Sequence, residues 1–195
     1  SLSPLPVLES APRSVVEEFI KGKIIHFGKN PILNIAGWPL SMLPVAVVYM
    51  SANRAGNIDN VVFDFSENEC TMSWDEGKEH NTIVCGMDGA ERYSKIRLAG
   101  IDFTAVSSAA WQSDSVLEIR MRPLESICER RIKLEFKGTS VTLTPSSTPP
   151  LSTIADSLKD IIKTFVPNEK IADIGEKAFM KLDSVIEAPL SGKLV

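Results

Sequence analysis

The stretch DSVLEIRMRPLESICERRIKLEFKGTSVTLT, residues 114–144, alternates apolar and polar side chains with hardly a break. Leu117, Ile119 and Met121 fall on one side of an extended chain, and the charged residues between them fall on the other. In the next segment, Ile132, Leu134 and Phe136 alternate with charged residues in the same way. Alternation over about four to eight residues is typical of half-buried strands. The stretch therefore predicts neighbouring strands with one core face and one wet face.

Outward from this stretch, the alternation extends from Val61 to Leu143 and is broken at short intervals by turn-forming residues. It divides into the segments VVFDFS, ECTMSW, NTIVCGM, RYSKIRL, IDFTAVSSAAW, DSVLEIRM, ICERRIKLEFK and SVTLT. Strands joined by tight turns form an antiparallel meander, and a long meander curls into a barrel or half-barrel to bury its apolar face. The expected fold is therefore mainly β with flanking α-helices.

The chain is expected to form one structural domain in three zones: an N-terminal zone at 1–57, the meander at 58–144 and a C-terminal zone at 145–195. The N-terminal zone is expected to hold a helix near Ser14–Lys21, with Val15, Val16, Phe19 and Ile20 on its apolar side, a strand at 23–28 and a helix around Leu40–Ala55. The C-terminal zone is interpreted as a linker, TPSSTPP at 144–150, followed by two amphipathic helices.

The composition argues against a nucleic-acid partner. The 195 residues carry a net charge of −4, with a pI near 5.3, whereas nucleic-acid-binding modules present a basic face. A cluster of arginines interleaved with glutamates is interpreted as a mixed, solvated strand face. Its members are Glu118, Arg120, Arg122, Glu125, Glu129, Arg130 and Arg131.

Residues 30–53 include no charged side chain, and their length alone would permit a membrane span. Polar, glycine and proline residues interrupt the segment, so a span is not expected. A buried loop and helix is the favoured interpretation, and a surface that docks on another domain is the alternative.

The three cysteines, Cys70, Cys85 and Cys128, have no Cys-x-x-Cys spacing, which argues against zinc or thioredoxin-like chemistry. If a hairpin loop centres on 77–78, Cys70 lies opposite Cys85 on the face that carries Trp74. Two packed, buried thiols are the favoured interpretation. A strained cross-strand disulfide is the alternative.

Catalytic motifs are missing from the sequence. His26 and His80 have no partners at metal-ligand spacing, so no metal site is expected. There is no Gly-x-Ser-x-Gly elbow, no phosphate-binding glycine loop and no Ser-x-x-Lys pair. We therefore expect no enzyme activity in this chain and no cofactor.

A resemblance rests on four motifs of the block at 85–149: Gly-x-x-Gly at 86–89, Ala-x-x-x-x-Ala-Trp at 105–111, x-Leu-x-Ile-x-x-Arg-Pro-Leu-Glu at 116–125, and Arg-x-x-x-Leu-x-Phe-x-Gly at 130–138. The block resembles the C-terminal accessory domain of β-lactamase-related serine hydrolases, the class C and penicillin-binding-protein-like group. The resemblance implies a lipocalin-like barrel that follows a hydrolase domain in a bacterial envelope or extracellular protein. Such a setting would favour a Cys70–Cys85 disulfide. The chain begins SLSPLPV, as expected for a segment of a longer protein.

The expected function is a non-catalytic accessory domain that docks on, or shapes access to, the upstream hydrolase domain of the same polypeptide. The family's catalytic residues would lie in that domain, and none is carried onto this segment. The alternative is a stand-alone barrel that binds an apolar or cell-wall-derived ligand, although side chains usually fill small barrels. Its candidate lining residues are Met72, Trp74, Phe103, Leu117, Ile119 and Met121.

Overall fold

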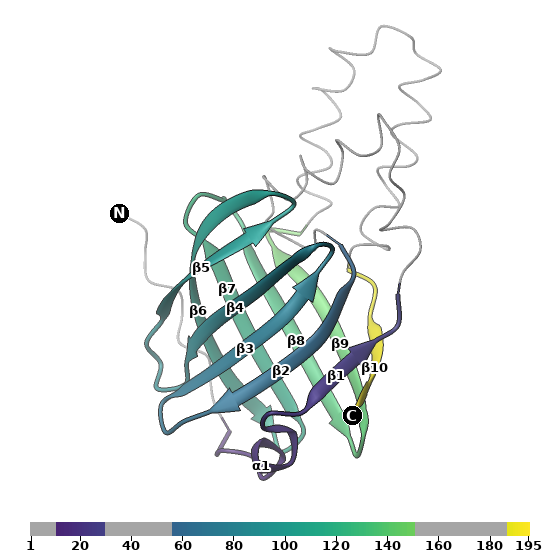
Figure 1. The fold of residues 1–195 in the computed structure, drawn as a ribbon. Coiled ribbons are helices and arrows are strands. Elements are labelled where there is room, and N and C mark those ends of the chain that lie inside the picture. The colour runs from purple at the N-terminus through teal and green to yellow at the C-terminus, as the bar shows by residue number, and fades with distance from the viewer. Residues whose placement is uncertain (1–10, 30–55, 151–186) are drawn as a thin grey trace, which may run out of the picture.

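Ten strands curl into one barrel in the computed structural model, which describes residues 11–29, 56–150 and 187–195 (Figure 1). The elements in chain order are α1 (Val16–Ile20), β1 (Ile24–Phe27), β2 (Ile58–Phe65), β3 (Glu69–Glu76), β4 (Glu79–Gly86), β5 (Arg92–Leu98), β6 (Ile101–Ser113), β7 (Val116–Pro123), β8 (Glu129–Lys137), β9 (Ser140–Thr148) and β10 (Leu190–Leu194). Around the barrel the order is β4-β3-β2-β1-β10-β9-β8-β7-β6-β5. Neighbours in this order are antiparallel, so the predicted mainly β, antiparallel barrel is confirmed.

The ring closes between β4 and the β5–β6 hairpin. A parallel pair, Gly86 with Ser108, joins β4 to β6. Between β4 and β5, the Asn81 side chain takes the place of a backbone ladder: its Nδ2 donates to the Arg97 carbonyl at 2.9 Å, and its Oδ1 accepts from the Arg97 N–H at 2.7 Å. A Cβ at Gly86 would lie 1.7 Å from the Ala90 carbonyl oxygen, so only glycine fits at this seam.

The predicted alternation and register are confirmed. Leu117, Ile119 and Met121 are all 0% exposed on the inner face of β7, while their neighbours face outward. In the β3–β4 hairpin, Cys70 lies opposite Cys85, as the two-residue loop predicted. Strand period fixes which side chains enter the barrel, and the turn fixes the register.

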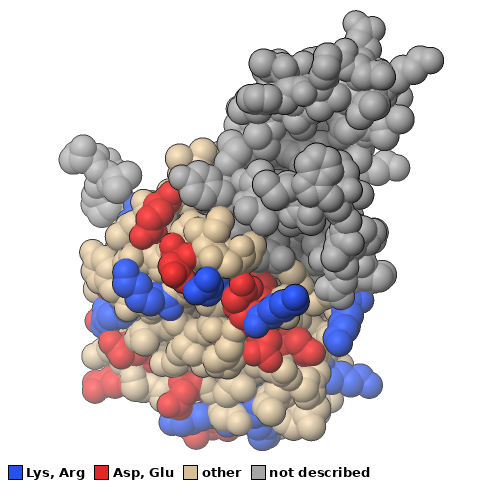
Figure 2. Space-filling view, turned by 45° about the horizontal axis from the view of Figure 1, so that its top comes forward, with Lys and Arg blue, Asp and Glu red and all other residues tan. Residues whose placement is uncertain are grey.

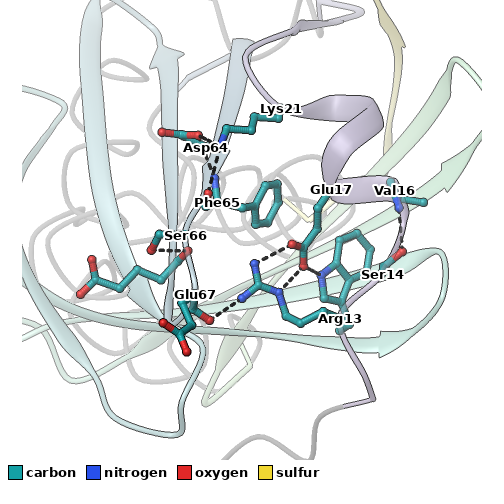
Figure 3. Close-up of polar contacts among 11 residues, drawn as sticks. Arg13, Ser14, Val16, Glu17, Lys21, Asp64, Phe65, Ser66 and Glu67 are labelled. Atoms are coloured by element: carbon teal, nitrogen blue, oxygen red, sulfur yellow. Dashed lines mark hydrogen bonds and ion pairs between the residues drawn. The ribbon is translucent and has the colours of Figure 1, made fainter.

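The helix α1 lies against one end of the barrel (Figure 1), but its orientation differs from the prediction. Val15 is 87% and Phe19 43% exposed, whereas Glu17 is buried. The Glu17 carboxylate accepts a hydrogen bond from the Trp111 indole at 2.6 Å and receives the Arg13 guanidinium (Figure 3). The prediction that Val15 and Phe19 lie on the buried side of the helix was therefore wrong. The buried contact of Glu17 with Trp111 orients α1 so that Val15 and Phe19 face outward.

The sequence interpretation of the C-terminal zone needs two corrections. β9 continues to Thr148, so the predicted linker at 144–150 is mostly strand. Pro145 is tolerated there because β10 pairs with β9 only as far as Leu143, which leaves an edge beyond it. The strand β10, which sequence analysis missed, inserts between β1 and β9.

Several sequence predictions lie outside the described residues: the helix at 40–55, the apolar segment at 30–53 and the two helices placed between 151 and 186. The predicted strand at 23–28 is confirmed as β1, although it is a full member of the barrel rather than an addition to it. Among the described residues, no helix has the length and apolar character that crossing a membrane requires.

Candidate functional site

The unexpected feature of the barrel interior is a buried arginine. Arg130 shares the inner face of β8 with Ile132 and Leu134, and all three are 0% exposed. The prediction that Arg130 belongs to a solvated outer face is therefore wrong. The other arginines of that cluster lie on the opposite face of their strands but are only partly exposed: the side chains of Arg120, Arg122 and Arg131 are 15%, 19% and 37% exposed. On the face drawn in Figure 2, acidic and basic side chains are interspersed rather than gathered by sign.

Glu76, the last residue of β3, is the counter-charge of Arg130. Its Oε2 lies 2.8 Å from Arg130 Nη1 and also accepts the Trp74 indole N–H at 2.8 Å. Both side chains of the ion pair are 0% exposed. A buried pair costs a large desolvation energy, which is recovered only when the geometry is good and the remaining polar groups find partners.

The remaining polar groups of Arg130 do not find such partners. Its Nε and Nη2 are buried and make no hydrogen bond within the part of the chain that the structure describes. These two nitrogens form one edge of the planar guanidinium, the edge that receives a carboxylate in a two-bond fork. Arg13 uses the same edge for Glu17, with its Nε and Nη2 each 2.5 Å from one carboxylate oxygen. The barrel interior therefore holds a guanidinium edge whose two donors have no acceptor among the described residues.

The surroundings of this edge are defined by the register of the sheet. Arg130 lies opposite Met121 on β7 and Ser147 on β9, and Met121 in turn lies opposite Ser107 on β6. Ser107 Oγ is also buried without a hydrogen-bond partner among the described residues. Ser147 Oγ is engaged by Glu187 at 2.8 Å. A second unpaired polar atom therefore lies on the same row of the inner wall.

Short side chains give this wall its shape. Along β6, Ala105, Ser107 and Ala109 occupy successive inward positions, each at most 3% exposed. Small side chains on the inner face leave more of the barrel interior unfilled than leucine or phenylalanine would.

All six predicted lining residues belong to the buried hydrophobic core of the barrel: Met72, Trp74, Phe103, Leu117, Ile119 and Met121. Two of them neighbour the Arg130–Glu76 ion pair. Met121 is paired with Arg130 across the β7–β8 ladder, and the Trp74 indole donates a hydrogen bond to Glu76. Sequence analysis missed Arg130, Glu76 and Ser107. The signal was present at Arg130 and Glu76, because each continues the period-two inner face of its strand.

The thiols of Cys70, Cys85 and Cys128 are free and 0% exposed in the structure. Burial raises the pKa of Cys70 and of Cys85, so both are poor nucleophiles in the folded chain. The disulfide alternative for Cys70 and Cys85 stays a prediction, since paired antiparallel positions bring Cα atoms to about 4.5–5.5 Å, within the range a disulfide spans.

Each of the two histidines has an aspartate partner on the outer face. His26 Nδ1 lies 3.3 Å from Asp59 Oδ1, and His80 Nδ1 lies 2.8 Å from Asp75 Oδ1. Over residues 11–29, 56–150 and 187–195, no three or more His, Cys, Asp or Glu side chains come together as a group that could hold a metal ion.

Comparison with known proteins adds little to this site. No family description matches the chain, and no curated protein matches it. Among solved structures, the Schistosoma mansoni fatty acid binding protein in complex with arachidonic acid is similar, at 11% sequence identity and a TM-score of 0.44. The match covers 67% of this chain and 89% of that one.

Proposed function

We propose that the barrel binds a small, mostly apolar molecule in its interior and holds a carboxylate of that molecule on the open edge of Arg130. The observation that carries the proposal is the pair of buried donors, Arg130 Nε and Nη2, that lack an acceptor among the described residues. Leaving a buried donor without an acceptor costs about 1–3 kcal/mol, and more when the donor is charged. One carboxylate would satisfy both donors at once.

The existing pair with Glu76 is compatible with a second carboxylate on the other edge. Arg92 shows on the surface that all three guanidinium nitrogens can be engaged at once: Nε by Glu69 at 2.7 Å, Nη2 by Asp88 at 2.8 Å and Nη1 by the Ala90 carbonyl at 3.0 Å. In the interior, Glu76 fixes the guanidinium through Nη1, so its free edge is already oriented before a ligand arrives. Such preorganisation reduces the entropic cost of binding.

The size and lining of the interior support an apolar ligand body. Eight-stranded barrels are about wide enough to be filled by side chains or to hold one small ligand, and the diameter grows with strand number. This barrel has ten strands and a run of short inner side chains on β6. Met72 and Met121 line the interior, and thioether side chains adapt readily to a ligand's shape.

Nothing among the described residues tests the predicted role as the accessory domain of a serine hydrolase, and that role stays a prediction. The two roles are compatible, because docking would use the outer surface and ligand binding the interior.

The test compares three probes of equal chain length: dodecanoic acid, methyl dodecanoate and dodecanol. Only the acid presents two equivalent, negatively charged oxygens to Arg130. We expect the acid to stabilise the protein by about 2.7 kcal/mol at 100 times its Kd, a melting-temperature rise of about 5–10 °C. The ester and alcohol should bind at least about tenfold more weakly.

Variants assign the effect to the proposed edge. The double variant Arg130→Met/Glu76→Leu removes both charges without leaving a lone buried ion, and it should lose the preference for the acid. Lys133→Met, on the outer face of the same strand, is the matched control and should keep that preference. Equal binding of acid and ester to the natural chain, or an acid preference that survives the double variant, would contradict the proposal.

A further inference from the structure

A groove lies on the outer face of the barrel where β10 fits between β1 and β9. It encloses about 540 Å³, within the range of small-molecule sites. The residues that line it are His26, Phe27, Gly28, Ser140, Val141, Thr142, Ser191, Gly192 and Lys193. It is separated from the Arg130 edge by the barrel wall, because Arg130 points inward.

The register of the three strands arranges the outward side chains in rows. One row runs His26, Lys193, Ser140, since Lys193 is the pairing partner of both other residues. The next row contains Ser191 and Thr142, which are also paired. Gly28 continues this row on β1, where its N–H donates to the Ser191 carbonyl at 3.1 Å.

Gly28 supplies the hollow of the groove. A Cβ there would meet nothing closer than the Ser191 carbonyl oxygen at 3.9 Å, so the space beside it is open. On the inner side of β10, Gly192 lets the Phe27 ring pack against the strand, since a Cβ would approach that ring to 2.7 Å. The floor of the groove is thus strand backbone, and polar side chains line it.

The charge of the lining is one-sided. Lys193 is exposed, and none of the described residues that line the groove is acidic, although the Asp59 carboxylate contacts the lining residue His26. Asp59 Oδ1 lies 3.3 Å from His26 Nδ1 and orients the imidazole ring. The other ring nitrogen, Nε2, is then on the side of the ring away from Asp59, where a ligand can contact it. On a chain with a net charge of −4, a groove lined by an ammonium, an imidazole and hydroxyl groups is a local site for an anion.

We propose that this groove binds a small phosphate ester. The phosphoryl group lies over the row of Lys193, His26 and Ser140, where the Lys193 ammonium and the Ser140 hydroxyl can donate to its oxygens. Because the Asp59 carboxylate accepts the Nδ1–H of His26, the Nε2 of His26 donates to the phosphoryl group in the doubly protonated, imidazolium form of the ring. The organic part lies along the row of Ser191 and Thr142, over Gly28. A groove of this volume is far larger than a bare phosphate ion needs, which is why an ester is the occupant.

The test uses the two histidines as paired reporters on the folded, full chain. The imidazole signals of His26 and His80 are followed by NMR at a fixed pH and in about 0.15 M sodium chloride, while glycerol 3-phosphate, inorganic phosphate or glycerol is added. Both histidines are held by an aspartate at Nδ1, so His80 reports any effect that is not specific to the groove.

The expected result is a saturable shift of the His26 signals with glycerol 3-phosphate, a weaker one with inorganic phosphate, and none with glycerol or at His80. Lys193→Gln should weaken binding at least tenfold, equivalent to about 1.4 kcal/mol. Lys193→Arg should retain it, as should Lys78→Gln, which removes an exposed lysine beside His80. Gly28→Val should fill the groove and abolish the shift without backbone strain, since its φ is not positive.

Three results would overturn the proposal. The first is equal shifts at His26 and His80, which would show a general salt effect. The second is binding that survives both Lys193→Gln and Gly28→Val. The third is that inorganic phosphate binds as tightly as glycerol 3-phosphate. The groove would then bind the anion alone and make no contact with the organic part of an ester. None of these results depends on whether dodecanoic acid binds inside the barrel.

Discussion

Removing the carboxylate of Glu76 should destabilise the barrel more than any ordinary surface change. In Glu76→Leu, the Arg130 guanidinium stays 0% exposed and loses its bond at Nη1. The Trp74 indole N–H loses its acceptor in the same step. Arginine cannot escape by losing a proton, because a guanidinium stays protonated in proteins. The variant therefore leaves a full positive charge buried without a counter-ion.

The size of the effect follows from the burial. Breaking a buried ion pair at one partner costs about 3–5 kcal/mol, against a total stability of about 5–15 kcal/mol for a typical domain. The double variant Glu76→Leu/Arg130→Met removes both charges but still leaves the buried Trp74 indole N–H without its acceptor, so it should cost about 1–3 kcal/mol, less than Glu76→Leu alone. The matched control is the exposed pair of Lys137 and Glu135, whose side chains are 77% and 42% exposed. Glu135→Leu should cost about 0–1 kcal/mol.

The assay is urea unfolding of the natural chain and the three variants, followed by tryptophan fluorescence, because Trp74 and Trp111 lie in the core. The midpoints and slopes give the free energy of unfolding for each variant. A cost below about 1 kcal/mol for Glu76→Leu would refute the reasoning, because it would mean that the guanidinium is hydrated rather than buried. A double variant that is less stable than Glu76→Leu would also refute it.

Three further outcomes are expected. The raised pKa values of Cys70 and Cys85 should make both thiols unreactive to iodoacetamide in the folded chain at pH 8 and reactive on unfolding; thiols that label after unfolding only when reductant is present would show a disulfide instead. Gly86→Ala should cost at least about 1–3 kcal/mol in urea unfolding, because its Cβ would lie 1.7 Å from a backbone carbonyl oxygen; an unchanged midpoint would contradict this packing. The pKa of Asp75 is lowered by the hydrogen bond from Asn60, so its stabilising contribution is present above the unfolded value of about 3.9 and is lost as the pH falls through the lower folded value. Asp75→Asn should therefore lose less stability than the natural chain below about pH 4, and identical acid unfolding curves would argue against the shift.

The strand pattern and the hairpin register were predictable from sequence because each depends on local rules. Alternation fixes the inner face of a strand, and a two-residue loop at 77–78 sets Cys70 opposite Cys85. The same rule reaches Arg130 by counting back from Ile132 in steps of two. The positive charge of Arg130 and the charged residues around it suggested the outer face. The period-two alternation of β8 places Arg130 on the inner face, which is where the structure has it.

Other parts of the fold depend on contacts that the sequence does not reveal. The rotation of α1 follows from a bond between Glu17 and Trp111, which are 94 residues apart. β10 has five residues, too few for alternation to show, and it becomes a strand only because β1 and β9 leave a gap for it. The unpaired edge of Arg130 is likewise hidden from the sequence, because it depends on which guanidinium nitrogen Glu76 binds in the folded chain.

The most direct measurement of the proposed function is the NMR signal of the Arg130 Nε–H group, assigned by its loss in Arg130→Lys. When dodecanoic acid saturates the barrel, this signal should move downfield to resemble that of Arg13, whose Nε already donates to a carboxylate. Methyl dodecanoate should produce a smaller change. An Arg130 Nε–H signal that does not move while the acid is bound would contradict the claim that this edge holds the ligand.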